Sequence, residues 1–380
     1  MGGRYAAALS QHPVPAHAVG ETAGQILDQL DGDDPDLVFC FASPHFVGVF
    51  DDVAHALRQL LTPKVFLGGT AVSIIGGAHE IEDEPALSVF AAVLPDAVLT
   101  PVALSVEETP DGTAVVGWPD LPSDPSTLLL FADPFTFPVD GFLRRLDDDR
   151  PGLTVIGGLA SAGGRPGTNR LGLDDAIVAA GAVGVFLEGV DVETVVSQGC
   201  RPIGDAFVVT RAERNFVEEL GGKPAMARLQ ELAANATDNE RELLQRGLHM
   251  GLVVDEHKAE FVRGDFLVRN VLGADQESGA VAVGDRVSVG QTVQFHVRDA
   301  AAADEDLREM LAGVDARAAL VFTCNGRGRH LFGVPDHDAG LVDQLLGPIP
   351  AAGAFCAGEI GPVGGRNFLH GFTASLALFR

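Results

Sequence analysis

AFCAGEIGPVGGRNFLHGFTASLALFR, residues 354–380, ends the chain and contains the pattern on which the fold depends. A short apolar segment runs into a glycine-rich turn that carries Cys356, Glu359 and Arg366, and a second apolar segment follows. A turn between two strands needs one or two glycines, and it needs neither a thiol nor a carboxylate. The stretch therefore predicts two strands joined by a turn whose polar side chains serve a purpose other than turning the chain.

The same order of elements occurs three times along the chain. In each copy an apolar strand is followed by a helix, a glycine-rich strand end and a returning strand; the first strands begin at Leu37, Leu128 and Leu320. The glycine-rich strand follows about 30 residues later, the length of a strand–helix–strand unit. A helical crossover makes the first two strands of each unit parallel. The sequence therefore predicts an α/β fold, mixed α+β in detail, with repeated strand–helix–strand–strand units in mixed, partly parallel sheets.

Periodic apolar residues and end signals predict the helices and the remaining strands. The expected helices are residues 17–30, 50–61, 224–245, 304–313 and 338–347. Residues 265–299 alternate in polarity as an antiparallel sheet does, and residues 107–126 are expected to form a Pro-rich surface connection. We expect a domain boundary near residue 220, which divides the chain into two related domains, residues 1–220 and 221–380.

Composition and charge exclude several classes of partner. The chain has 380 residues, 46% of them hydrophobic, and a formal net charge of −27, so it is an acidic protein that builds large cores. Such a charge repels phosphate backbones and anionic lipid, which excludes nucleic acid and membrane surfaces as main partners. The four cysteines form no CxxC pair, no signal peptide is evident, and the longest apolar run has 12 residues, residues 176–187. These features predict a cytoplasmic protein.

The polar strand ends predict a ligand site. Ligands of open α/β sheets bind beyond the carboxyl ends of parallel strands. Arg327, in the segment CNGRG, offers a planar fork of donors that suits a carboxylate, and Glu359 offers a carboxylate that suits an ammonium group. Together they would hold an amino acid or another zwitterion. Two alternatives stay open: Arg327 binds loop carbonyls or a structural aspartate, or the two side chains pair with each other.

The glycine-rich end of the second unit, GGLASAGG at residues 157–164, is expected at the same edge. It lacks the GK[ST] ending and the G-x-G-x-x-G spacing of nucleotide-binding loops, so a nucleotide is discounted. We predict that Gly157, Gly158 and Ser161 line the ligand cleft.

The cysteine and histidine side chains allow further functions. Cys324 and Cys356 could be a nucleophile pair, a metal pair or core thiols, with His330 and His370 available as bases. No histidine spacing matches a zinc motif such as HExxH. A single axial histidine for haem leaves no spacing signature, so the cofactor is undetermined and haem stays an alternative.

In order along the chain, the motifs resemble those of FIST-domain proteins that carry both the FIST N-terminal and the FIST C-terminal regions. The resembling stretches include DLVFCFASPHF, FLGGTAVSIIGG, LLLFADPFTFP, VIGGLASAGG, GDFLVRN, FTCNGRGRHLFG and AFCAGEIGPVGGRNFLHGFTA. The resemblance implies an intracellular sensory and signal-transduction module, proposed to bind small ligands such as amino acids. It also implies that some relatives bind haem and sense nitric oxide. Inside matching motifs lie Cys324, Asn325, Arg327, Gly328, Cys356, Glu359 and His370, which we predict to bind the ligand.

Three functions follow from these observations, and a fourth reading, an adaptor whose clefts are vestigial, stays open beside them. The first is a small-ligand-binding sensory module, favoured because polar strand ends converge and no catalytic template is complete. Its signalling output would lie in a separate protein, because the two FIST regions occupy almost the whole length. The alternatives are a haem-binding nitric-oxide sensor and a cysteine-dependent enzyme of unknown reaction, so enzymatic activity is left undecided.

Overall fold

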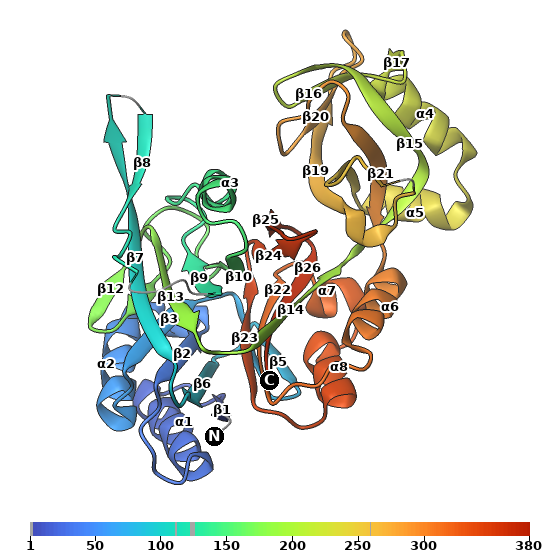
Figure 1. Cartoon of the computed structure of the whole chain (residues 1–380). Helices are drawn as coiled ribbons and strands as arrows, with labels where there is room; N and C mark the ends of the chain where they lie inside the picture. The colour runs from blue at the N-terminus through green and yellow to red at the C-terminus, as the bar shows by residue number, and fades with distance from the viewer. Residues whose placement is uncertain (1–2, 111, 122–125, 259) are drawn as a thin grey trace. The chain divides into compact units, whose positions relative to one another are not determined.

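A computed structural model describes residues 3–110, 112–121, 126–258 and 260–380 (Figure 1). Its secondary structure is mixed, with long helices interspersed among short strands that form four sheets. This confirms the mixed α/β class. The chain forms two compact units: residues 1–196, 307–369 and 373–380 make the first, and residues 197–306 with 370–372 make the second.

The first unit contains the three predicted repeats, each built on one parallel strand pair. The pairs are β2 (Leu37–Ala42) with β3 (Val65–Thr70), β9 (Thr127–Ala132) with β10 (Thr154–Leu159), and β22 (Ala318–Cys324) with β23 (Ala351–Cys356). The returning strands, β6 (Leu87–Val93), β13 (Ala182–Glu188) and β26 (Thr373–Phe379), pair antiparallel with the first strand of their own repeat. The strand order predicted from the sequence is therefore confirmed in all three copies.

Each repeat also contains a hairpin, and each hairpin joins the sheet of another repeat. The hairpins are β4 (Ser73–Gly76) with β5 (His79–Glu82), β11 (Leu171–Leu173) with β12 (Ala176–Val178), and β24 (Glu359–Val363) with β25 (Arg366–His370). The first hairpin pairs with β23 of the third repeat, the second with β3 of the first, and the third with β10 of the second. The three repeats therefore close into a ring by exchanging hairpins.

Aromatic rings mark the centre of this ring. Phe41, Phe131 and Phe322 hold equivalent positions in β2, β9 and β22, and their ring centroids lie 6.0, 6.0 and 6.4 Å apart in the three pairwise combinations. All three side chains are fully buried in one core that also includes residues of β3, β10 and β23. Each of the three sheets thus contributes one face to a common core. The burial of apolar side chains in this core holds the repeats together.

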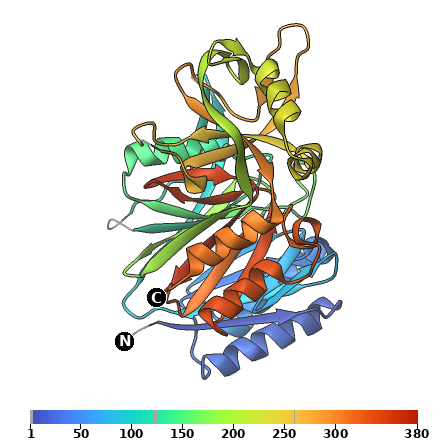
Figure 2. The ribbon, with the colours of Figure 1, turned by 90° about the vertical axis from the view of Figure 1, so that its right-hand side faces the viewer.

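Helices cover the outer faces of the three sheets. In the first repeat these are α1 (Pro15–Gln29) and α2 (Phe50–Leu61), and in the second α3 (Val139–Asp149). In the third, α6 (Ala300–Leu311) and α8 (His337–Leu346) pack side by side on the sheet, as Figure 2 shows in orange and red. Short segments η1 (Pro44–Val49) and α7 (Gly328–Phe332) follow the first strands of their repeats. Strand β1 (Arg4–Ser10) extends the first sheet beside β6, and β14 (Val192–Gln198) borders β26.

The second unit is a ring of antiparallel strands. Its strand order is β15 (Cys200–Glu213), β21 (Thr292–Arg298), β18 (Leu248–Val253), β19 (Phe266–Ala274), β20 (Val281–Val283), β16 (Phe216–Leu220) and β17 (Lys223–Pro224). An additional pairing between β15 and β16 closes the ring. The alternating pattern of residues 265–299 is confirmed as strands, and the short η2 (Arg263–Asp265) precedes them.

Some predicted elements were wrong in extent. The helix expected at residues 224–245 is two helices, α4 (Ala225–Asn235) and α5 (Asp238–Arg246), because the Thr237 hydroxyl and Glu240 form a capping box that starts a new helix. The helix expected from residue 304 begins at Ala300, where the Asp299 carboxylate accepts hydrogen bonds from two backbone N–H groups.

The connection expected at residues 107–126 was also wrong in part. Strand β7 (Val98–Thr109) extends through its first residues and pairs with β8 (Gly112–Val116) as the long hairpin of Figure 1. Residues 111 and 122–125 of this connection lie outside the described residues.

Candidate functional site

The carboxyl ends of the third repeat's parallel strands bring the two predicted cysteines together. Cys324 and Cys356 are the last residues of β22 and β23, and they are direct partners in the parallel ladder. The adjoining Asn325 donates its backbone N–H to the Cys356 carbonyl at 2.8 Å. Cys356 is fully buried and Cys324 is 6% exposed. Burial raises the pKa of the Cys356 thiol well above its usual value, with the nearby Glu359 adding to the effect, so the thiolate is disfavoured.

Glu359 begins the exchanged hairpin and stands opposite Gly158 in the β10–β24 ladder. Its counterparts in the other two hairpins are Ile74, opposite Ala354 in β23, and Leu171, opposite Gly69 in β3. Both counterparts are fully buried apolar residues of the common core, and Glu359 is equally buried. The third repeat thus places a carboxyl group where the other two repeats place an apolar side chain.

The two oxygens of the Glu359 carboxyl group differ in their surroundings. Oε2 accepts hydrogen bonds from the Thr373 backbone N–H at 3.0 Å and from its hydroxyl at 2.8 Å. Oε1 is buried and makes no hydrogen bond of ordinary geometry to the described residues, although the neighbouring Cys324 thiol interacts with this carboxyl group as a donor. Burial raises the pKa of Glu359 to about 8, against the opposing effects of Thr373, the Arg327 charge and the Cys324 thiol. A buried oxygen without a hydrogen bond of ordinary geometry is costly, which marks this group as a candidate for binding.

Position 158 has room for glycine and for no larger residue. A Cβ atom at this position would lie 2.4 Å from the Cys356 sulfur, so a side chain on β10 is incompatible with the thiol. The neighbouring Gly157 has φ of +154° and its Cβ would lie 1.8 Å from the Leu130 carbonyl oxygen. Gly158 thus lets the second repeat's backbone approach the third repeat's thiol, and Gly157 lets β10 lie close to β9 within the second repeat.

Ser161 joins all three repeats at one point. Its hydroxyl donates to the Phe355 carbonyl of the third repeat and accepts from the Val72 N–H of the first at 2.9 Å. Its own backbone N–H donates to the Thr70 carbonyl at 3.2 Å. The strand ends of the three repeats therefore converge at Ser161, whose polar groups are occupied by the protein.

Arg327 is fully buried and pairs with an aspartate that the sequence assigned to a helix start. Its Nε and Nη2 donate to the two carboxylate oxygens of Asp338 at 2.7 and 2.8 Å, a bidentate pair. Asp338 also accepts from the Thr323 hydroxyl at 2.6 Å and contacts His337 Nδ1 at 2.9 Å. Burial opposes the charge on Asp338, but Arg327, His337 and Thr323 together lower its pKa. The guanidinium plane is therefore committed to a structural aspartate, one of the two alternatives that the sequence left open.

A second buried carboxyl group adjoins this pair. Glu80, in the first repeat's exchanged hairpin, accepts from the Asp338 and Ala339 N–H groups at 2.8 and 3.0 Å through Oε1. It thereby caps the start of α8. Burial and the Asp338 charge raise the pKa of Glu80 to about 8, and Oε2 is buried without a partner among the described residues.

The remaining predicted residues are spread around this region. Asn325 is exposed, and Gly328 is buried with φ of +59°, its Cβ position 2.9 Å from Glu82 Oε1. His370 ends β25, is 4% exposed and is grouped with the second compact unit, apart from the other nine predicted residues.

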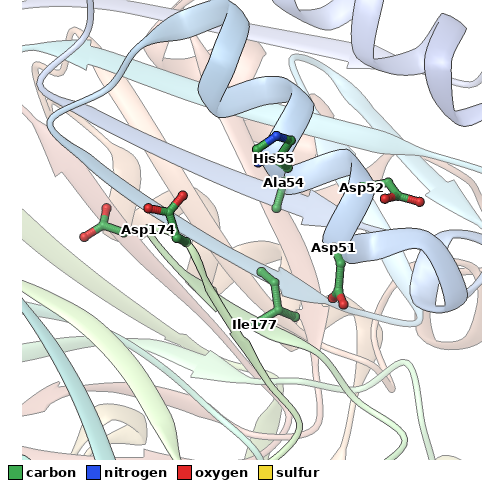
Figure 3. A pocket seen from close by; sticks show the side chains of 7 residues that line it. Asp51, Asp52, Ala54, His55, Asp174 and Ile177 are labelled. Carbon is green, nitrogen blue, oxygen red and sulfur yellow. The ribbon is translucent and has the colours of Figure 1, made fainter.

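Several cavities of the first unit lie away from these residues. One of them, with a volume of about 440 Å³, is lined by Asp51, Asp52 and His55 of α2 and by Asp174 and Ile177 of the second repeat's hairpin. Figure 3 shows these side chains. The Asp174 carboxylate accepts the Phe66 N–H at 3.0 Å and thus holds the hairpin to β3. Within the described ranges, no cluster of three or more His, Cys, Asp or Glu side chains is arranged to hold a metal ion.

Sequence reasoning missed Asp338, Glu80 and Thr373 as parts of this site. Asp338 carried a signal, since it follows Arg327 by eleven residues, but its position before an apolar helix pattern equally predicts an N-cap. Glu80 and Thr373 become neighbours of the site only through hairpin exchange and strand return, which leave no local signal.

Comparisons with known proteins identify the family. The FIST N domain matches residues 36–223 and the FIST C domain matches residues 225–362. An uncharacterized protein of Mycobacterium tuberculosis is 44% identical over 382 residues, covering 99% of each chain. An uncharacterized protein of Mycobacterium bovis is 44% identical over 373 residues, covering 97% of this chain and 96% of its own. No helix in the described residues has the length and apolarity to cross a membrane. The chain therefore belongs to the FIST family, whose domains are associated with signal transduction and sensing.

Proposed function

We propose that this protein is a cytoplasmic small-ligand sensor whose ligand presents an ammonium group to Glu359. The observation that carries the proposal is Glu359 Oε1, a fully buried carboxyl oxygen that makes no hydrogen bond of ordinary geometry to the described residues, in a position that is apolar in both other repeats. An ammonium group supplies both a donor and the charge that a buried carboxylate lacks. An amino acid is a small ligand class that carries such a group.

Binding and ionisation are coupled in this account. Without ligand, burial holds the pKa of Glu359 at about 8, so the group is mostly protonated near neutral pH. An ammonium ion beside Oε1 favours the carboxylate, so binding expels a proton. The ligand therefore replaces a neutral buried acid with a buried ion pair.

A route to Glu359 leads past Cys324. Asn325 is exposed, and Cys324, directly before it, is the less buried of the two strand-end thiols. Opening the segment after β22 would admit a ligand without unfolding the common core. Arg327 stays paired with Asp338, so its part in the proposal is the positive charge near Glu359 and the bracing of this segment.

Signalling is proposed to pass to a separate protein. Together the FIST N and FIST C matches span residues 36–362, so the matched part of the chain consists of these two domains. The segment that opens for the ligand is the natural place for a change that a partner detects.

A thermal-shift panel with the twenty common amino acids tests this function. Wild-type protein is compared with Glu359→Gln and with the matched control Glu80→Gln, which neutralises another buried carboxyl group of similarly raised pKa. A saturating amino acid should raise the melting temperature of wild type and of Glu80→Gln by several degrees, and that of Glu359→Gln far less. Equal shifts in Glu359→Gln and wild type, or no shift with any amino acid, would overturn the proposal.

A further inference from the structure

We infer that the cavity between helix α3 and strand β8 binds a small aromatic carboxylate. The cavity has a volume of about 620 Å³, within the range that accommodates small organic ligands. It shares no residue with the Glu359 site and goes beyond the sensor function proposed above. Its walls come from two elements of the first unit and from the segment that follows β8: Thr113, Val115, Trp118, Pro138, Gly141, Phe142, Arg145, Leu146, Asp149 and Arg150 line it.

Trp118 supplies an aromatic surface at this cavity. It is the chain's only tryptophan, and 37% of it is exposed although an indole is a costly group to leave in water. Phe186 meets it edge to face at 5.2 Å between ring centroids, and Phe142 lies at 6.2 Å. The indole is therefore held by two buried rings while part of its surface faces the cavity, which suits stacking on a flat aromatic ligand.

The charge at the rim selects an anion. Two of the three charged residues that line the cavity, Arg145 and Arg150, are cations, and the third is Asp149. The Arg145 Nε donates to the Asp149 carboxylate at 2.6 Å, which orients the guanidinium group. Its side chain is 76% exposed, and a guanidinium binds a carboxylate through pairs of parallel N–H groups. An apolar wall with two arginines beside it fits a ligand with an aromatic body and a carboxylate.

Gly141 allows the cavity to be filled without disturbing the fold. It lies within α3, and a Cβ atom added there would meet no heavy atom within 4 Å. Leucine is a better helix former than glycine, so Gly141→Leu should retain the helix while its side chain occupies the cavity. Gly20→Leu in α1 is the matched control, because the same substitution there also meets open space.

Fluorine NMR of protein labelled with 5-fluorotryptophan tests the inference, since Trp118 gives a single resonance. Naphthalene-2-carboxylate should shift this resonance saturably in wild type and in Gly20→Leu, and the shift should be lost in Gly141→Leu. The neutral amide of the same ring should bind several-fold more weakly. Arg145→Gln should remove this preference for the carboxylate, whereas Arg145→Lys should keep part of it.

Three results would overturn the inference. The first is a resonance that the carboxylate leaves unmoved in wild type. The second is a shift that persists unchanged in Gly141→Leu, which would place the probe elsewhere. The third is equal affinity of wild type for the carboxylate and the amide, which would show apolar adsorption of an adventitious additive only.

Discussion

Gly158 stands directly opposite Glu359 in the β10–β24 ladder, so one repeat supplies the bare backbone against which another repeat's buried carboxyl group lies. The same glycine faces the Cys356 sulfur, which a Cβ atom would approach to 2.4 Å. The contact between the second and third repeats therefore depends on the absence of a side chain at this position.

Gly158→Ala should destabilise the protein by about 1–3 kcal/mol, because the added methyl overfills the core against Cys356. Urea unfolding measures the loss. Adding Cys356→Ala should recover part of it by removing the sulfur. Gly164→Ala, where a Cβ meets open space, is the control and should change stability little. Equal stability of Gly158→Ala and wild type, or no recovery in the double variant, would contradict the geometry.

Arg327→Ala should cost about 3–5 kcal/mol of folding free energy, because it leaves the Asp338 carboxylate buried without its cation. Arg329→Ala, two residues away, removes an exposed arginine and should cost less than about 1 kcal/mol. Thermal and urea unfolding compare the two. Changing Asp338 to Asn in the Arg327→Ala background should regain stability, since it removes the stranded charge, and a further loss instead would contradict this account.

The first unit should lose stability as pH rises from about 4.5 to about 8, because it contains the two buried glutamates. Glu80 and Glu359 have pKa values raised to about 8 in the folded protein against a usual value of 4.5, so in this window the folded state holds more protons than the unfolded chain. Each group should contribute a slope of roughly 1.4 kcal/mol per pH unit. Denaturant unfolding between these pH values measures it, and Glu359→Gln should reduce the slope. An unchanged slope in that variant would show that Glu359 ionises freely.

The second unit should lose stability as pH falls from about 6.5 towards 4. His249 and His296 are cross-strand partners on β18 and β21, and burial lowers the pKa of each to about 4, with the Arg298 charge adding to the effect on His249. The unfolded chain takes up protons first, so each histidine costs roughly 1.4 kcal/mol per pH unit in this window. The protection factors of the amides in β18 and β21, which compare observed with intrinsic exchange rates, should therefore fall with pH. They should fall less in His296→Phe. Protection that is independent of pH would refute the prediction.

The repeated architecture could be predicted from the sequence, but the closure of the ring could not. Apolar strands near Leu37, Leu128 and Leu320 recur with a spacing that local periodicity reveals. The exchanged hairpins are short, and their partners lie far along the chain: Ile74 stands opposite Ala354. Such pairing is decided by which sheet edges are left open once the repeats have formed, which no local pattern encodes.

The sequence predicted where the strand ends of the candidate site come together, but it did not predict the surroundings of the charged groups there. Strand ends of parallel pairs meet at one edge, so Cys324 and Cys356 lie together as the repeat implies. The partner of Arg327 was not predictable, because Asp338 resembles a helix cap in the sequence and turns inward in the fold. The burial of Glu359 was not predictable either, because it follows from the hairpin exchange that places Glu359 at the position held by Ile74 and Leu171 in the other repeats.

The most direct test of the central claim is a count of protons released on ligand binding. The amino acid that stabilises the protein most is titrated into it by calorimetry at pH 7, in two buffers of different ionisation enthalpy. With the pKa of Glu359 at about 8, binding should release roughly 0.9 proton from wild type and from Glu80→Gln, and close to none from Glu359→Gln. Binding that releases no proton from wild type, or as many from Glu359→Gln, would contradict the assignment of Glu359 as the ammonium-binding group.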